Sequence, residues 1–301
     1  MNLHRLRLLR EFQLRGTIAA VAEALSYTPS AVSQQLALLE REAGVPLLRP
    51  AGRRMQLTHA GEVLASHATI LLTQVELAEA DLAASRGEVG GTVRAAAFQT
   101  ATMTLIPVVL DLLGQRHPNL RLLISEIHPD DALSVLAAHE FDLVIGEEYP
   151  GVPLPRDPDI HREELAEDPL HLVYNPSRAR PAQHLTDFAE HPWVMEPRGN
   201  AARQWAVATC RAAGFEPDVR YESSDLLVHR RLVETGHAVA LVPSLLWGGK
   251  RADLRLIDPP GGPARTIFTA VRRGAERGPA VRAFRRALTE AIPGRPAEPR
   301  S

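Results

Sequence analysis

The sequence contains little cysteine and no long hydrophobic run. Cys210 is its only cysteine, which excludes an intrachain disulfide and a zinc cluster held by several thiolates. No stretch approaches the ~18–20 consecutive apolar residues that a membrane-spanning helix needs. The first ten residues carry arginines with no apolar segment after them, so we expect no signal peptide. These absences favour a globular, cytoplasmic protein that does not enter a membrane.

The common catalytic motifs are also missing. No glycine-rich nucleotide-binding loop follows an expected strand, and the sequence has neither a Gly-x-Ser-x-Gly nucleophile elbow nor a His-Glu-x-x-His zinc motif. The 12 histidines are scattered along the chain. We therefore expect no catalytic residue, no bound metal and no cofactor.

Positive charge is distributed unevenly along the 301 residues. The whole chain has a net charge of −2, yet residues 1–60 contain eight arginines and four glutamates and so carry +4. The remaining residues therefore carry −6. Because the chain is longer than a single core usually allows, we expect two or three domains. A small basic domain joined to an acidic body is typical of a DNA-binding protein with a separate regulatory domain.

Residues 1–44 have the apolar spacing of three short helices. The expected helices cover residues 3–15, 18–25 and 29–43. Thr17 and Thr28 can cap the second and third helices, and Pro29 suits the first position of the third. The last two helices and their short turn have the spacing of a helix-turn-helix, in which the second helix enters the major groove. A generic three-helix bundle is the alternative.

A β-hairpin is expected after these helices. Residues 45–48 are apolar and extended, residues 49–54 make a basic turn, and residues 55–58 alternate like a strand. Such a wing brings arginines to phosphates or to the minor groove, while short polar residues and an amide on the third helix can contact base edges. The predicted DNA-binding residues are Thr28, Pro29, Ser30, Ser33, Gln34, Arg49, Arg53 and Arg54.

The order and spacing of these segments resemble the LysR-type transcriptional regulators. The matching segments are GTIAAVAEAL at 16–25, PSAVSQQL at 29–36, LE at 39–40, GVPLL at 44–48, RR at 53–54, LT at 57–58 and AG at 60–61. The chain departs from the family pattern at Leu48, where phenylalanine is usual, and at Pro50, where arginine is usual. The resemblance implies a winged helix-turn-helix over residues 1–58 that binds double-stranded promoter DNA.

A long helix is expected over residues 59–86. No proline or glycine lies between Gly61 and Gly87, and apolar residues recur at helical spacing. A small head domain cannot cover an apolar stripe of this length, which suggests a partner helix. The resemblance implies a dimerising linker over residues 59–87, in a homodimer that assembles further into a homotetramer. The alternative is that the helix packs on the C-terminal domain of its own chain.

The C-terminal residues, 91–301, alternate between strand and helix patterns. The first expected series has strands at 93–98, 120–127 and 142–146, with helices at 104–116 and 131–139. This order predicts a βαβαβ unit with a parallel sheet. The second expected series has strands at 171–174, 193–196, 218–222 and 238–242, with helices at 185–189, 200–213 and 226–235. A strand at 266–272 and a helix at 279–291 complete the pattern.

The fold class expected is therefore multidomain α/β, with an N-terminal winged helix-turn-helix, a linker helix and a two-subdomain C-terminal domain. The effector domain of LysR-type regulators resembles type II periplasmic binding proteins, which implies a cleft between the subdomains. The resemblance also implies two crossings between them, near residues 162–165 and 263–267. Subdomain I would comprise residues 91–162 and 267–292, and subdomain II residues 163–266.

Four loops are expected to face this cleft. Ligands of open α/β sheets bind beyond the carboxyl ends of strands, where helix N-termini point inward. Hydroxyls, free N–H groups and an arginine there could hold a carboxylate on a small-molecule effector. The alternative is that the hydroxyls only cap their helices. The predicted effector-binding residues are Gln99, Thr100, Thr102, Glu147, Arg198, Asn200, Ser223 and Ser224.

Three functions are compatible with the sequence. The favoured one is a homo-oligomeric transcription regulator, not an enzyme, whose DNA contacts respond to the effector. The second is an enzyme fused to a winged helix, which should show a nucleophile–base pair or a cofactor loop in its cleft. The third is a binding protein whose head makes only protein contacts.

Overall fold

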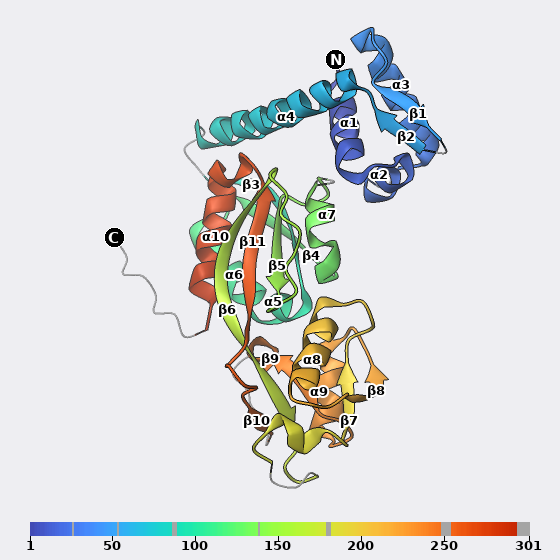
Figure 1. Ribbon diagram of the computed structural model, residues 1–301. Coiled ribbons are helices and arrows are strands. Elements are labelled where there is room, and N and C mark those ends of the chain that lie inside the picture. The colour runs from blue at the N-terminus through green and yellow to red at the C-terminus, as the bar shows by residue number, and fades with distance from the viewer. Residues whose placement is uncertain are drawn as a thin grey trace.

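The computed structural model describes residues 1–25, 27–52, 54–85, 89–137, 139–178, 182–247 and 254–293. Its parts follow one another in a row (Figure 1). A small head lies at one end of a long helix, a first α/β unit lies against that helix, and a second α/β unit lies farthest from it. No helix in the described ranges is both long enough and apolar enough to cross a bilayer.

Three capped helices form the head. They are α1 (Leu3–Arg15), α2 (Ile18–Ala24) and α3 (Pro29–Ala43). The hydroxyl oxygen of Thr17 accepts a hydrogen bond from the Ala20 N–H, and that of Thr28 accepts from the Ala31 N–H. Apolar side chains from all three helices, including Leu9, Val21 and Leu36, share one core. The predicted helices are confirmed because caps and apolar spacing agree in this segment.

The wing is a tighter hairpin than the sequence indicated. Its strands are β1 (Leu48–Ala51) and β2 (Arg54–Leu57), which pair antiparallel. The expectation of a turn over residues 49–54 was therefore wrong, since Arg49 and Pro50 lie in β1. A two-stranded sheet leaves the outer edge of each strand unpaired, so a proline is tolerated there. Arg53 lies outside the described residues.

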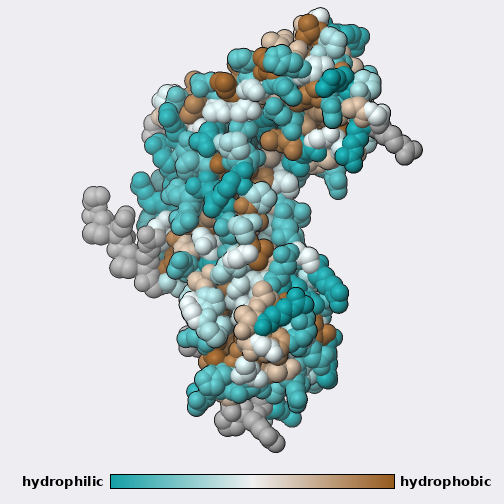
Figure 2. Space-filling model, in the orientation of Figure 1, coloured by the Kyte–Doolittle hydropathy of each residue, from teal (hydrophilic) through white to brown (hydrophobic). Residues whose placement is uncertain are grey.

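The long helix α4 (His59–Ser85) packs partly on its own chain. One side buries Ala65, Ala68 and Leu72, against α1 and the turn η4 (Ala275–Arg277). Ala65 and Ala68 belong to the core of the head, whereas the contacts with η4 and α10 (Pro279–Ala291) are of the kind that the alternative predicted. Another set of large apolar side chains on the helix stays exposed: Val63, Ile70, Leu71 and Leu82. Figure 2 shows hydrophobic residues along this edge of the molecule, over α4 and the head.

The first α/β unit is built on a parallel βαβαβ series. Its elements are β3 (Gly91–Ala97), α5 (Gln99–Thr104), α6 (Ile106–Arg116), β4 (Leu120–Glu126), η1 (Pro129–Asp131), α7 (Ala132–Ala137) and β5 (Leu143–Glu148). Strand β3 lies between β4 and β5 and is parallel to both, as predicted. Residues 99–102 were expected as a loop, but they form α5. The helix expected over 104–116 is α6, and the additional helix α5 meets it at Leu105.

Two long strands connect the units. Strand β6 (Ile160–Tyr174) pairs with β11 (Ala264–Arg272) as far as Pro169, then with β9 (Ala240–Pro243) from Leu170 onward. The sequence indicated only the end of β6, because its first half carries exposed glutamates that hide the strand pattern. The predicted subdomain limits at 162/163 and 266/267 fall inside β6 and β11. The division into subdomains stays a prediction.

The second α/β unit holds a separate small sheet. Its remaining elements are η2 (Leu185–Phe188), β7 (Pro192–Met195), α8 (Ala201–Ala212), β8 (Asp218–Glu222), α9 (Leu226–Glu234), η3 (Ser244–Trp247) and β10 (Arg255–Ile257). Strands β7 and β8 pair parallel, and β10 pairs with β6. The last helix, α10 (Pro279–Ala291), returns to pack on α6 of the first unit. Strand β10, of three residues, was not predicted.

Candidate functional site

The first turn of α3 presents a polar face. Ser30, Ser33 and Gln34 are exposed, while Val32 and Leu36 on the opposite side are buried in the head core. Thr28 and Pro29 are also exposed at the start of the helix. The Thr28 hydroxyl lies 3.0 Å from the Ser30 hydroxyl in addition to its capping bond. Short hydroxyls and an amide on one helical face are suited to hydrogen bonding with base edges.

The wing adds positive charge beside this face. Arg49 on β1 and Arg54 on β2 are exposed. The wing is fixed to α3 through Glu40, whose carboxylate accepts hydrogen bonds from the N–H groups of Leu47 at 2.8 Å and Leu48 at 2.9 Å. Sequence reasoning assigned no role to Glu40, since its partners become neighbours only when the wing folds back. The same contact orients both wing arginines relative to α3.

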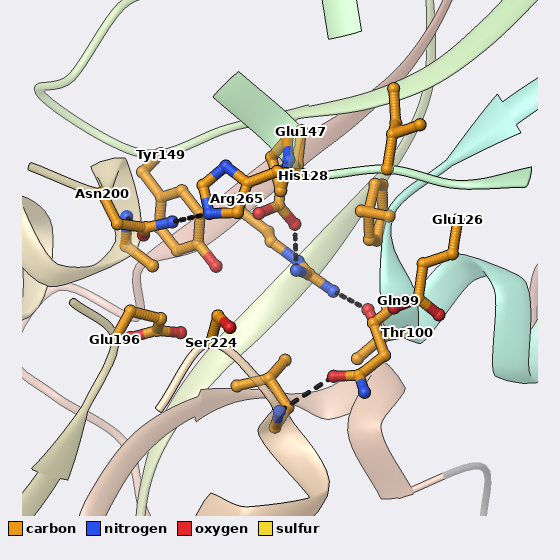
Figure 3. Close-up of a pocket in the computed structure, with 15 residues that line it drawn as sticks. Gln99, Thr100, Glu126, His128, Glu147, Tyr149, Glu196, Asn200, Ser224 and Arg265 are labelled. Carbon is orange, nitrogen blue, oxygen red and sulfur yellow. Dashed lines mark hydrogen bonds and ion pairs between the residues drawn. The ribbon is translucent and has the colours of Figure 1, made fainter. Parts of the chain in front are cut away.

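A cavity of about 250 Å³ lies between the two α/β units (Figure 3). Five of the eight predicted effector-binding residues line it: Gln99, Thr100, Glu147, Asn200 and Ser224. The other lining residues are Phe98, Glu126, Ile127, His128, Pro129, Tyr149, Glu196, Ala202, Leu226 and Arg265. The rule that ligand sites form at the carboxyl ends of strands therefore located the cavity.

The other three predicted residues do not line this cavity. The Thr102 hydroxyl donates to the Phe98 carbonyl oxygen at 3.2 Å, as a helical threonine often does. The Ser223 hydroxyl accepts a hydrogen bond from the Asp225 N–H at 3.1 Å and so closes a local turn. Arg198 is exposed and lines a separate surface hollow. The geometry does not support their assignment to the cleft.

Arg265 of β11 is the central side chain of the cleft, and sequence reasoning missed it. Its side chain is 1% exposed. The guanidinium donates to Asp168 at 2.7 Å, to the Thr100 hydroxyl at 2.7 Å and to the Glu147 carboxylate. It also lies over the Phe98 ring, 4.8 Å from the ring centroid. The only signal in the sequence is an arginine at the start of an apolar strand, which is weak evidence for burial.

Burial and charge together set the ionisation of the cleft. Burial by itself lowers the pKa of Arg265, but Glu147, Tyr149 and Asp168 raise it above its ordinary value. Burial raises the pKa of Glu147 in spite of the neighbouring guanidinium. Burial also raises the pKa of Glu196 to about 7. The cleft therefore combines a permanently charged arginine with a carboxyl group that titrates near neutral pH.

The helix N-termini at the cleft already have protein acceptors. On α8, the Asn200 side-chain oxygen accepts from the Ala202 N–H at 2.7 Å. On α9, the Asp225 side chain accepts from the Leu227 N–H at 2.8 Å, and the side-chain amide oxygen of Gln99 accepts from the Leu226 N–H at 2.8 Å. These N–H groups are therefore not free to hold an effector carboxylate. Arg198 also lies outside the cavity. Several of the groups that were expected to donate hydrogen bonds to an effector carboxylate are therefore not available in the cleft.

A hydrogen-bonded serine, histidine and aspartate lie outside the cleft. His171 Nε2 is 2.7 Å from the Ser244 hydroxyl, and its Nδ1 is 2.6 Å from Asp258. This is the nucleophile–base pair that an enzyme should show. The Leu245 N–H, next to the serine, instead donates to the Asp168 carboxylate at 3.0 Å. A developing oxyanion there would face a carboxylate, so the arrangement does not favour acyl transfer.

Two family models match the chain. The model described as "Bacterial regulatory helix-turn-helix protein, lysR family" matches residues 3–62, and the model "LysR substrate binding domain" matches residues 86–293. Together they cover the head, the first residues of α4 and nearly all of both α/β units.

Curated relatives match over most of their length. The transcriptional dual regulator GltC of Bacillus subtilis is 26% identical over 248 residues, which are 81% of this chain and 81% of GltC. The DNA-binding transcriptional dual regulator OxyR of Escherichia coli is 26% identical over 305 residues, which are 98% of this chain and 96% of OxyR.

Solved structures share the fold of the whole chain. A full-length OxyR variant from Pseudomonas aeruginosa has a TM-score of 0.62 at 19% identity and covers 96% of this chain and 94% of its own. Full-length CbnR in complex with its target DNA has a TM-score of 0.52 at 21% identity and covers 97% of this chain and 99% of its own.

Proposed function

The chain belongs to the LysR family of bacterial transcription regulators, and from that premise we propose how it performs this function. It binds double-stranded promoter DNA as a homo-oligomer in the cytoplasm, and a small molecule in the cleft changes that binding. The observation that carries the proposal is the pairing of an exposed polar face on α3 with a lined cavity between two α/β units. The cleft serves for binding and not for catalysis.

The DNA-binding residues divide into two roles. Ser30, Ser33 and Gln34 contact base edges from α3, the amide of Gln34 pairing with adenine. Thr28 and Pro29 set the start of that helix against the sugar-phosphate backbone. Three wing arginines neutralise phosphates and supply affinity without sequence preference. These are Arg49, Arg53 and Arg54.

Assembly into a dimer follows from α4. The exposed side chains of Val63, Ile70 and Leu71 lie on a helix that already packs its other face on the same chain. A second copy of α4 would cover them, and two heads would then contact two half-sites of DNA. Further assembly into a tetramer would bring two such dimers onto one promoter.

Effector binding acts through contacts that bridge the cleft. The Gln99 amide on α5 donates to Asp225 at 2.7 Å and accepts from Leu226 on α9, so it links the two units. An effector that replaces or strengthens these bonds changes the closure of the cleft. The response requires different effector affinities in the open and closed arrangements.

The test is DNA binding by fluorescence anisotropy. Labelled DNA from upstream of the protein's own gene is compared with random duplex over a salt series. Specific DNA should bind ~10³-fold more tightly than random duplex. Gln34→Ala should reduce only the specific affinity, by roughly tenfold. Arg54→Ala should weaken binding to the specific and the random duplex alike. It should also reduce the steepness of log affinity plotted against log salt concentration by about one.

Gln13→Ala, an exposed change on α1, is the matched control and should behave as wild type. Absence of binding to any duplex at low salt would refute the regulator function for this chain. Equal binding to every duplex, unaffected by Gln34→Ala, would refute sequence recognition by α3.

Peroxide sensing, which the names of some relatives indicate, is not favoured for this chain. Those relatives are described as hydrogen peroxide-inducible genes activators. Thiol sensors need an accessible thiolate, usually with a second cysteine nearby. Cys210 is fully buried in α8, and burial raises the pKa of its thiol to about 12. A small-molecule effector in the cleft is therefore the better candidate.

A further inference from the structure

The cleft has more negative than positive side chains. Three carboxylates line it, from Glu126, Glu147 and Glu196, against the single guanidinium of Arg265. That guanidinium already donates to two carboxylates and a hydroxyl, and the two carboxylates offset its charge. Once the Arg265 pairs are accounted for, the charge left in the cavity is carried by carboxylates.

Glu196 is the carboxylate whose position needs an explanation. It follows β7, is 9% exposed and lines the cavity, and Figure 3 shows its carboxyl group directed into the space between the units. Within the described ranges it makes no ion pair. The nearby Arg203 donates instead to the Glu196 backbone carbonyl at 2.8 Å and to Glu222 at 2.7 Å.

A buried carboxylate without a cation is unfavourable, so the group either takes up a proton or is paired with a positive charge that a ligand supplies. The remaining walls suit an organic ligand, because Phe98, Tyr149 and Leu226 give the cavity apolar surface. A cation with a short apolar body would therefore satisfy both the carboxylate and the walls. An anionic ligand would meet Glu126 and Glu196 with no unoccupied guanidinium to offset them.

We propose that the effector carries a positively charged amine or guanidinium group that binds the Glu196 carboxylate. This assignment rests on the proposed function of the cleft as the effector site. The sequence suggested an effector with a carboxylate, and the proposed effector has the opposite charge. The Arg265 cluster holds β11 and β6 together beside the site, and Glu196 provides the ligand contact.

Ionisation of Glu196 gives the binding a definite pH dependence. A cation binds the ionised carboxylate, so affinity should rise as pH increases from about 6 to about 8. The titratable and charged groups near Glu196 are Arg265, Arg203, His128, Glu147 and Tyr149. A neutral ligand that accepts a hydrogen bond from protonated Glu196 would show the opposite trend.

The experiment measures thermal stabilisation of the full-length protein without DNA. The cationic probes are benzylamine and agmatine, and the matched probes are benzyl alcohol and benzoate. A ligand that binds only the folded state raises Tm with concentration. We expect the amines to raise Tm, benzyl alcohol to do so less, and benzoate to have no effect. Glu196→Gln should weaken amine binding by about tenfold or more at pH 8.

Glu216→Gln is the matched control, because Glu216 is exposed and pairs with Arg211 away from the cleft. It should bind amines as wild type does. Stabilisation by benzoate equal to that by benzylamine, unchanged amine binding in Glu196→Gln, or no response to either amine would each overturn the proposal. Specific DNA binding in the same preparation shows that the regulator function stands even when the cationic effector fails.

Discussion

At the scale of single residues, Arg265 decides the chemistry of the cleft. Its partners Asp168 and Glu147 are buried with it, so each charge depends on the others. Removing one member of a buried ion cluster leaves uncompensated charge, which costs more than the cluster contributes as a whole. Arg265 therefore stabilises the ion cluster and does not itself bind the effector.

Arg265→Met should destabilise the protein by about 3–5 kcal/mol at pH 7–8, because it leaves two buried carboxylates without a cation. The deficit should shrink toward pH 5, because burial raises the pKa of Glu147 and lets that carboxyl take up a proton. Urea unfolding at both pH values measures the difference. Arg211→Met, at an exposed ion pair, is the control and should unfold like wild type. A pH-independent deficit would contradict the charge argument.

Glu196→Gln should stabilise the unliganded protein near neutral pH. The folded pKa of about 7 lies above the ordinary value, so the folded state holds the proton more tightly than the unfolded chain. The free energy of unfolding of the wild type therefore falls as pH rises from 4.5 to 7. That of the variant does not fall for this reason, because glutamine does not ionise. The expected gain is on the order of 3 kcal/mol at pH 8 and little at pH 4.5.

Denaturant unfolding at the two pH values checks this expectation. Equal stability of variant and wild type at pH 8 would count against a buried carboxylate that lacks a cation. A gain in stability together with lost amine binding would show that Glu196 is kept for function at the expense of stability.

At the scale of elements, the contact between α3 and the wing shows how one side chain positions a hairpin. Glu40 receives two backbone N–H groups from the segment that enters β1. These donors would otherwise lie partly buried without an acceptor, which is unfavourable. The wing arginines depend on this contact because a two-stranded hairpin is only marginally stable by itself.

Glu40→Ala should loosen the wing while α3 stays folded. Amide exchange at Leu47 and Leu48 should accelerate, because their hydrogen bonds are lost, and head stability should fall by about 1–3 kcal/mol. Affinity for random duplex should fall as the arginines lose their fixed position. Glu23→Ala, exposed on α2, is the control. Unchanged exchange at both amides would exclude Glu40 as the anchor.

At the scale of the whole molecule, β11 joins the cleft to the linker helix. Arg265 lies in the cleft at one end of the strand, and Arg272 lies at the other. Arg272 donates to Glu76 of α4 at 2.6 Å and to the Phe141 carbonyl oxygen at 2.6 Å. A displacement of β11 on effector binding would therefore reach α4 and, through its packing on α1, the head.

Glu76→Gln should weaken the coupling between cleft and head without changing binding at either site. Benzylamine should still raise Tm, but its effect on DNA affinity should fall toward none. The measurement is DNA affinity with and without benzylamine. Glu79→Gln, exposed on the same helix, is the control. A full response in Glu76→Gln would show that coupling does not pass through this contact.

The sequence by itself determined the three helices of the head, the long helix and most of the order of strands and helices. Those features depend on caps and periodicities that act within a few residues, such as Thr28 before Pro29. Local signals also located the cleft, since it follows from strand ends. They were less reliable where short-range patterns compete, as at residues 99–102, where hydroxyls typical of a loop form α5.

Only the tertiary structure decided the charge of the cleft. The Arg265 partners Asp168, Glu147 and Thr100 lie 97, 118 and 165 residues away along the chain. No local pattern shows that these groups satisfy one another and leave Glu196 without an ion pair in the described part of the chain. Ionic interactions depend on distance in space and on burial, so the character of the site emerges only when distant segments pack together.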